Sequence, residues 1–296
     1  MPEPRFSISA VSTLAASLGE DLDAYAAAGV DGIGIWELKL PPGDDAESLA
    51  RVRGSGLEVT NCVPAIPSIL PLPLIEGPVE PRERIEAICA SIRRLAPFEP
   101  QSVVVLTGPA GDLDPAEARR TVAEGLRRIG REALAAGVRV GLEPMQRLGA
   151  GDWTIATSIP EALELLDEVG EPALGVTFDV WHLWNTETLH DDIRDHVARF
   201  TGVHVSDWRG QTRGWADRVL PGEGIAGVGA IVRALEDAGW TGPYDLEVFS
   251  DNGTFGDDYE DSLWNLPADE LARLGREAFL KVWQAQMAPA PPSGVR

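Results

Sequence analysis

Short apolar runs and longer amphipathic runs alternate along the whole chain. Most of the apolar runs lack the polar–apolar alternation of half-buried strands, which is typical of parallel strands buried on both faces. We predict strands at residues 6–12, 30–37, 57–63, 102–108, 138–144, 174–179, 200–207 and 243–250.

The segments between these runs have the spacing of amphipathic helices. Two of them carry clear boundary signals. Asp114 followed by Pro115 begins one helix, which Gly137 ends, and Ser158 with Glu161 forms a capping pattern at the start of another. We predict helices at residues 14–29, 46–53, 81–96, 114–137, 158–170, 188–199, 227–240 and 268–287.

Eight successive strand–helix units predict an α/β fold, a single (β/α)₈ TIM barrel over residues 1–287. The alternative is an open doubly wound sheet, but no GxGxxG motif follows the first strand. Residues 64–81 contain six prolines, which excludes a helix or central strand and predicts a long ordered loop of the kind that often lies over a site. The Pro-rich residues 288–296 predict a disordered tail.

Composition and charge narrow the classes of function. A net charge of −22 argues against nucleic acid as a partner, and no apolar run is long enough to cross a membrane. Cys62 and Cys89 are too few for a disulfide framework, so we interpret both as buried free thiols. The N-terminus lacks the apolar region of a secretory signal, and together these features predict a cytoplasmic protein.

Charged side chains gather where the predicted strands end, and in such a barrel these ends form the active-site face. A carboxylate such as Asp179, at the end of a buried strand, is unfavourable unless a positive group lies beside it. The strand ends carry Glu37, Glu143, Asp179, His204 with Asp207, and Glu247.

Four of these residues lie on four consecutive strands, about 4.8 Å from one strand to the next, so their side chains can converge. A single Glu at a strand end is typical of a solvated residue, and a lone His is typical of a hydrogen-bonded core residue. We interpret Glu37 as solvated, with a polar pocket residue as the alternative. The coincidence of four predicts one divalent metal ion, with Mn²⁺, Mg²⁺ or Co²⁺ favoured and Zn²⁺ open. The predicted ligands are Glu143, Asp179, His204 and Glu247.

Motifs along nearly the whole barrel resemble the xylose isomerase-like TIM-barrel superfamily of sugar isomerases and epimerases. They are LEPM with Glu143, FDVWH with Asp179 and His182, HVSDW with His204 and Asp207, DRVLPGEG with Arg218, and DLEVF with Glu247.

The ketose 3-epimerase branch of this superfamily implies roles for several residues. The resemblance implies that the four predicted ligands bind the metal, and that Glu143 and Glu247 also act as the acid and base on opposite faces of the sugar. It implies that His182 and Arg218 donate hydrogen bonds to substrate oxygens, and we add Asp207 as a substrate contact. The stretch EPMQRLGAG departs from the epimerase pattern, because Gly149 stands where a Glu is expected, and this argues against a free ketohexose.

Seven of the nine tryptophans fall at strand ends or in the loops after them. Indole faces pack well on the C–H faces of sugars, although each Trp alone is equally typical of a residue that pins a loop to the barrel. Trp36 and Trp181 are the tryptophans that we expect to line the pocket.

We therefore predict a metal-dependent sugar or polyol isomerase or epimerase that works by proton transfer through a metal-bound enediolate. The alternative on the same scaffold is a lyase, a keto-inositol dehydratase or an enzyme that eliminates from a 3-keto-glycoside. A non-catalytic sugar-binding barrel is the alternative from another class. By analogy with related barrels we also expect a homo-oligomer.

Overall fold

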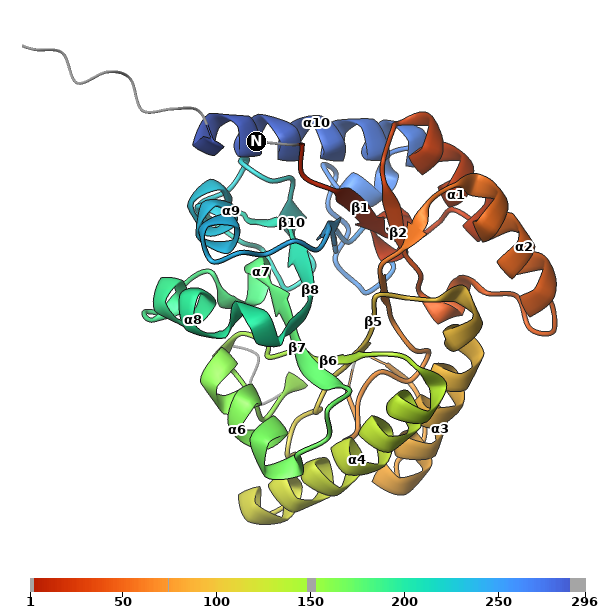
Figure 1. Cartoon of the computed structure of the whole chain (residues 1–296). Helices are drawn as coiled ribbons and strands as arrows, with labels where there is room; N and C mark the ends of the chain where they lie inside the picture. The colour runs from red at the N-terminus through yellow and green to blue at the C-terminus, as the bar shows by residue number, and fades with distance from the viewer. Residues whose placement is uncertain (1–2, 74, 148–152, 288–296) are drawn as a thin grey trace, which may run out of the picture.

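The strands of this chain form a closed parallel barrel with the helices around it, as the computed structural model shows for residues 3–73, 75–147 and 153–287 (Figure 1). The predicted (β/α)₈ fold is confirmed. Within the described residues the sheet runs in the order β3-β2-β1-β11-β8-β7-β6-β5-β4. Its strands are β1 (Phe6–Ser9), β2 (Gly32–Gly34), β3 (Glu58–Val59), β4 (Asn61–Cys62), β5 (Ser102–Val105), β6 (Val140–Leu142), β7 (Leu174–Asp179), β8 (Phe200–Val205) and β11 (Tyr244–Leu246).

The barrel closes through the predicted strand 57–63, which the structure divides at Thr60. Its first part, β3, pairs with β2, and its second part, β4, pairs with β5. The two ends of the sheet are thus consecutive in the chain, and the open doubly wound alternative is excluded.

The helices lie outside the strands and bury their apolar stripes against them (Figure 1). The predicted caps are present: Asp114 accepts the N–H groups of Ala116 and Glu117, and Ser158 accepts that of Glu161. The main helices are α1 (Leu18–Ala27), α2 (Asp45–Ser55), α3 (Pro81–Leu95), α4 (Pro115–Ala136), α6 (Ile159–Val169), α8 (Leu189–His196), α9 (Val228–Asp237) and α10 (Ala268–Met287).

Several predicted boundaries are wrong by a few residues for identifiable reasons. The first strand stops at Ser9 because residues 10–13 form a 3₁₀ turn, and α1 begins only after Ser17, whose side chain forms a capping box with Glu20. Helix α2 continues past Gly54 and ends at Gly56, which has the left-handed φ of 77° that glycine accepts without strain.

Two short elements within predicted loops matter for the site. A single helical turn, α7 (Val180–Leu183), follows β7 directly. The segment after β8 contains an antiparallel pair, β9 (Asp207–Trp208) with β10 (Arg218–Val219), which returns the chain to the barrel mouth. Both elements carry side chains back over the strand ends.

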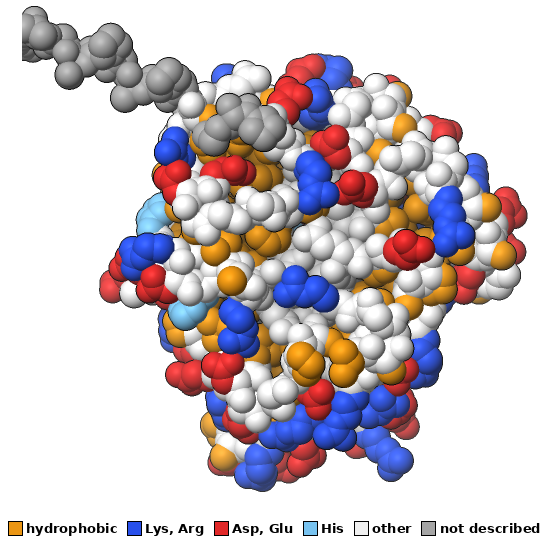
Figure 2. Space-filling view, in the orientation of Figure 1, with side chains coloured by type: hydrophobic (Ala, Val, Ile, Leu, Met, Phe, Trp, Pro, Cys, Tyr) orange, Lys and Arg blue, Asp and Glu red, His pale blue; other side chains and the backbone are white. Residues whose placement is uncertain are grey.

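The acidic net charge is not spread as a uniform negative surface. Figure 2 shows acidic and basic side chains interspersed over one face, with basic residues gathered over α4. Arginines of α4 pair with glutamates across the surface, for example Arg131 with Glu171 at 3.0 Å.

Cys62 and Cys89 are free and buried, as predicted. In the described part of the chain, each helix is too short or too polar to cross a membrane. The predicted tail, 288–296, lies outside the described residues.

Candidate active site

Four ionisable side chains meet at the C-terminal end of the barrel, each from a neighbouring strand. Glu143 directly follows β6, Asp179 is the last residue of β7, His204 lies near the end of β8, and Glu247 directly follows β11. Strands β6, β7, β8 and β11 are adjacent in the sheet, and Asp179 stands opposite His204 in the register of β7 and β8. We call Glu143, Asp179, His204 and Glu247 the four-residue cluster.

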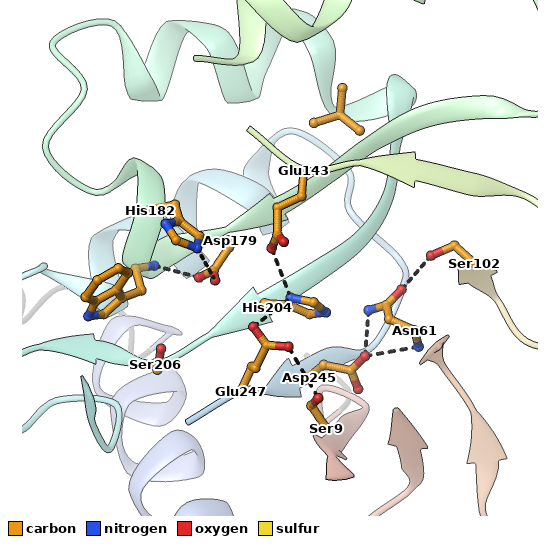
Figure 3. A network of polar contacts seen from close by, with 12 residues as sticks. Ser9, Asn61, Ser102, Glu143, Asp179, His182, His204, Ser206, Asp245 and Glu247 are labelled. Carbon is orange, nitrogen blue, oxygen red and sulfur yellow. Dashed lines mark hydrogen bonds and ion pairs between the residues drawn. The ribbon is translucent and has the colours of Figure 1, made fainter. Parts of the chain in front are cut away.

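Each residue of the four-residue cluster offers one ligand atom, and these atoms lie within 4.8 Å of one another. His204 Nδ1 lies 3.3 Å from Glu143 Oε1 and 3.4 Å from Glu247 Oε2. Figure 3 shows the two glutamates reaching His204 from opposite sides. All four side chains are buried, so three carboxylates share a region of low dielectric.

Arg218 supplies a permanent positive charge beside the four-residue cluster. Its Nη1 lies 2.9 Å from Asp179 Oδ2 and 3.4 Å from Glu247 Oε2. The guanidinium is held between the rings of Trp181 and Phe249, at 4.7 and 4.9 Å from their centroids. With His204 neutral, the three carboxylates and the one guanidinium carry a net charge of −2. A divalent cation would balance this charge.

Burial and mutual charge shift the pKa values of the four-residue cluster in opposite directions. Burial raises the pKa of Glu143 against the opposing effect of His204, and the charges of Glu247 and Asp179 add to the rise. Burial also opposes ionisation of Glu247, but His204 and Arg218 outweigh it and hold the pKa of that carboxyl below its usual value. Burial alone would lower the pKa of His204, yet Glu247 and Glu143 raise it well above the ordinary value.

Several polar atoms here lack a hydrogen-bond partner among the described residues. They include Glu143 Oε1 and both ring nitrogens of His204. Buried polar atoms are nearly always paired, so three atoms of two neighbouring residues without a hydrogen bond indicate that a ligand completes the site. A set of three oxygens and one imidazole nitrogen suits a divalent ion such as Mn²⁺, Mg²⁺, Co²⁺ or Zn²⁺. The residues present thus fit the metal that the sequence predicts.

His182 lies beside the four-residue cluster on the helical turn α7. Its Nδ1 accepts the backbone N–H of Gln146 at 3.3 Å, and its Nε2 lies 3.7 Å from Asp179 Oδ2. Burial, with the Arg218 charge, lowers the pKa of His182 to about 4, so the ring is neutral at pH 7 with Nε2 as its donor. His182 is therefore separate from the four ligand atoms and available to a substrate oxygen.

A second buried carboxylate, Asp245, lies deeper in the barrel. Its Oδ1 accepts hydrogen bonds from Ser7 and Thr60. Its Oδ2 accepts from the backbone and side-chain nitrogens of Asn61, at 3.2 and 2.5 Å (Figure 3). Ser102 in turn donates to Asn61 Oδ1 at 2.7 Å. We call Asp245, Ser7, Thr60, Asn61 and Ser102 the Asp245 network. The sequence interpretation missed it because Asp245 lies within a strand.

A cavity of about 330 Å³ opens above the four-residue cluster. Glu143, His182, Arg218 and Glu247 line it, as do the two predicted tryptophans, Trp36 and Trp181. The Pro-rich loop contributes Pro64, Pro67, Leu72 and Ile75 to its wall. A larger hollow of about 720 Å³, lined by residues such as Arg5 and Trp240, contains none of the predicted site residues.

Two strand-end carboxylates have other roles. Asp207 does not line the cavity: its oxygens accept the backbone N–H groups of Trp208, Gly222 and Ala226, which fixes the loop around β9 and β10. Its predicted substrate contact stays a prediction. Our interpretation of Glu37 as a solvated residue is wrong, because Glu37 is buried and accepts from Ala65 N and Arg94 Nη1.

Sequence reasoning also missed part of the aromatic wall. Phe249 and Phe255 line the cavity from the segment after β11, and Trp153 and Trp215 line it from two other loops. Trp153 and Trp215 belong to the tryptophans found after strand ends, but no periodic pattern marks the two phenylalanines. Gly149, where the sequence departs from the epimerase pattern, lies outside the described residues.

The match to a known family covers most of the chain. A family model described as "Xylose isomerase-like TIM barrel" matches residues 22–281. Over 163 residues the chain is 26% identical to a D-psicose 3-epimerase from Enterocloster bolteae, a match that covers 54% of this chain and 49% of that protein. The matched stretch therefore spans about half the length of this relative.

Solved structures give the same architecture. A protein from Sinorhizobium meliloti 1021 is 25% identical, with a TM-score of 0.81 over 94% of this chain and 98% of that one. The IolI protein with a bound zinc atom is 16% identical, with a TM-score of 0.77 over 96% of this chain and 100% of that one. At this identity the second likeness shows the fold alone.

Proposed function

Since this chain belongs to the xylose isomerase-like TIM barrel family, we propose that it is a divalent-metal-dependent sugar or polyol isomerase or epimerase. The observation that carries the proposal is the four-residue cluster, buried, partly unpartnered and open to the cavity. The D-psicose 3-epimerase relative supports the sugar chemistry, and the zinc bound by the IolI protein supports a metal on this scaffold.

Glu143, Asp179, His204 and Glu247 would hold the metal. A divalent ion bound there would act as a Lewis acid that polarises a substrate carbonyl. Glu143 and Glu247 approach the same point from opposite sides, so one can remove a proton from the carbon beside the carbonyl while the other returns one. Return to the other face of the same carbon is epimerisation, and return to the neighbouring carbon is isomerisation.

Three other residues orient the substrate and the acid–base pair. Arg218 keeps Glu247 ionised and presents its guanidinium to the cavity. Neutral His182 offers Nε2 as a donor to a substrate oxygen, and Trp181 holds Arg218 in place through its ring face. The apolar wall excludes water, which strengthens each of these electrostatic contacts.

The test is proton exchange in D₂O with added Mn²⁺, followed by NMR across ketoses, keto-inositols and keto-glycosides. We expect deuterium at the carbon beside the carbonyl of at least one compound, and loss of exchange after a chelator removes the metal. The control is Glu164→Gln, an exposed glutamate of α6, which should exchange at the wild-type rate.

Two outcomes would contradict the proposal. Loss of a β-substituent in place of exchange would assign the lyase chemistry to the same residues. The protein would instead be a non-catalytic sugar-binding barrel if panel members bind without exchange and if Glu143→Gln and Glu247→Gln bind them with the wild-type affinity.

A further inference from the structure

The cavity is divided into a polar floor and an apolar wall. Of the described residues that line it, Glu143, His182, Arg218 and Glu247 form the floor, and Glu76 lies at the exposed margin. The other sixteen lining residues are all Trp, Phe, Leu, Ile, Val, Met, Pro or Ala. Many of them also form an apolar cluster separate from the main core, which includes Val63, Leu72, Val104, Leu106, Trp153 and Trp181.

Aromatic rings form a connected frame within this wall. Trp215 contacts Trp153, Phe249 and Phe255 at centroid distances of 5.8, 5.6 and 5.1 Å. Phe249 in turn contacts Trp36 at 5.7 Å. The interplanar angles run from 52° to 81°, so ring edges and faces alternate, which is the arrangement into which another aromatic ring packs favourably.

The apolar character continues to the mouth of the cavity. Leu38 and Phe255 line it and are 56% and 44% exposed, among the few large apolar side chains of the described residues that face solvent. A ligand in the cavity would contact these two side chains and shield part of their apolar surface from water.

A free hexose fits this wall poorly. Each hydroxyl that lies against the apolar wall would lose its bound water without gaining a side-chain partner. The polar residues of the floor can bind the carbonyl and the hydroxyls next to it, whereas the apolar wall is complementary to an apolar group of the ligand. The volume, about 330 Å³, is near the lower end of the roughly 300–1,000 Å³ of small-molecule sites, which suits one sugar ring and one further ring.

We propose that the substrate is a keto-sugar derivative that carries an aryl group, with the sugar carbonyl on the polar floor and the aryl ring in the frame of Trp36, Trp153, Trp215, Phe249 and Phe255. This rests on the proposed function, because the floor is the acid–base site. It is consistent with the departure of the EPMQRLGAG stretch from the ketohexose epimerase pattern.

The test compares phenyl and methyl 3-keto-β-D-glucopyranoside, which share the sugar ring and differ only in the aglycone, a phenyl ring or a methyl group. For the Mn²⁺-loaded protein we would measure the Kd by titration calorimetry and the kcat/KM for deuterium exchange or aglycone release. We expect the phenyl compound to bind at least about 10-fold more tightly, the low end of what a buried apolar group contributes. D-Fructose should bind no better than the methyl compound.

Trp215→Ala tests the position of the ring, since Trp215 joins three other rings of the frame. The ratio of the two Kd values should fall toward one. Trp184→Leu is the matched control: Trp184 contacts Trp208 at 5.7 Å but does not line the cavity, so the ratio should stay at the wild-type value.

The two readouts separate the inference from the proposed function. Preferential binding of the phenyl compound without exchange or release supports the aryl site and contradicts the proposed enzyme. The aryl site is overturned if both compounds are turned over with equal Kd values, or if D-fructose is turned over as fast as the phenyl compound. In either case the proposed enzymatic function stands. A ratio that Trp215→Ala leaves unchanged overturns the position given to the ring.

Discussion

The four-residue cluster and the single carboxylate of Asp245 lie at two levels of this barrel, and their hydrogen-bonding needs are met very differently. Asp245 and Glu247 are two residues apart along the chain at the end of β11, so both point into the barrel. Asp245 accepts four hydrogen bonds from Ser7, Thr60 and Asn61. In the four-residue cluster, Glu143 Oε1 and both nitrogens of His204 make no hydrogen bond among the described residues, although His204 Nδ1 lies 3.3 and 3.4 Å from the two glutamates.

The difference separates a structural group from a functional one. A buried carboxylate with a full set of donors stabilises the fold that supplies them, whereas three buried carboxylates beside a single guanidinium oppose folding. Proteins keep the second arrangement where a ligand completes it. We therefore expect substitutions in the four-residue cluster to change activity and metal binding, and substitutions in the Asp245 network to change stability.

The largest effect should come from Glu143→Gln. Because the amide cannot transfer the proton, the rate of α-proton exchange in D₂O should fall by about 10²–10⁴-fold, the usual contribution of a general acid or base. The free energy of unfolding of the metal-free protein should stay within about 1 kcal/mol of wild type or rise, because burial and the charges of Glu247 and Asp179 oppose the ionised form of Glu143 more strongly than His204 favours it. Unfolding in urea measures the second quantity. A stability loss as large as the activity loss would contradict the functional assignment.

The converse effect is expected for Asp245→Asn. The new amide places a donor against the donors of Asn61 and removes the charge that they stabilise. The free energy of unfolding should fall by about 3 kcal/mol, since leaving buried donors unsatisfied costs about 1–3 kcal/mol for each group. The bound-metal content, measured by mass spectrometry on folded protein, should stay at the wild-type level. Loss of metal at unchanged stability would reverse the two roles.

Metal should stabilise the protein only through the four-residue cluster. At a free Mn²⁺ concentration about 100 times its Kd, the free energy of unfolding of wild type should rise by about 2.7 kcal/mol. Asp179→Asn should show a smaller rise or none, because one ligand oxygen is replaced by an amide. Asp245→Asn should show the same Mn²⁺-induced rise in the free energy of unfolding as wild type. Urea titrations with and without Mn²⁺ measure this rise for all three proteins. An equal increment in wild type and Asp179→Asn would place the metal elsewhere.

The smallest effects compare two serines on one face of β1. Ser7 donates to Asp245, whereas Ser9 donates to Glu247 Oε1 at 3.4 Å and accepts from Trp36 Nε1. Ser7→Ala should lower the free energy of unfolding by about 1 kcal/mol, the value of one hydrogen bond, with little change in exchange rate. Ser9→Ala should change the exchange rate more than Ser7→Ala does. The opposite order would show that the boundary between the two groups lies elsewhere.

Sequence reasoning brought Glu143, Asp179, His204 and Glu247 together because parallel strands of a barrel end at one edge. The interpretation of Glu37 as a solvated residue was wrong, since strand-end position does not fix where a side chain points. The 3₁₀ turn Glu37–Lys39 directs that carboxylate toward Arg94.

Other features depend on contacts between distant parts of the chain and leave no local pattern. The donors to Asp245 come from β1, Thr60 and β4, far away in the sequence. The position of Arg218 depends on the β9–β10 pair inside an otherwise polar loop. Phe249 and Phe255 reach the cavity from a turn-rich segment, so the apolar wall emerged only from the structure.

Metal stoichiometry tests the central claim most directly. Protein purified without chelator would be incubated with Mn²⁺, desalted and analysed by inductively coupled plasma mass spectrometry. We predict about one ion per chain for wild type and Asp245→Asn, and none for His204→Ala, in which the only nitrogen ligand of the four-residue cluster is removed. Wild-type protein that retains no divalent ion, or His204→Ala that retains as much as wild type, would contradict the claim.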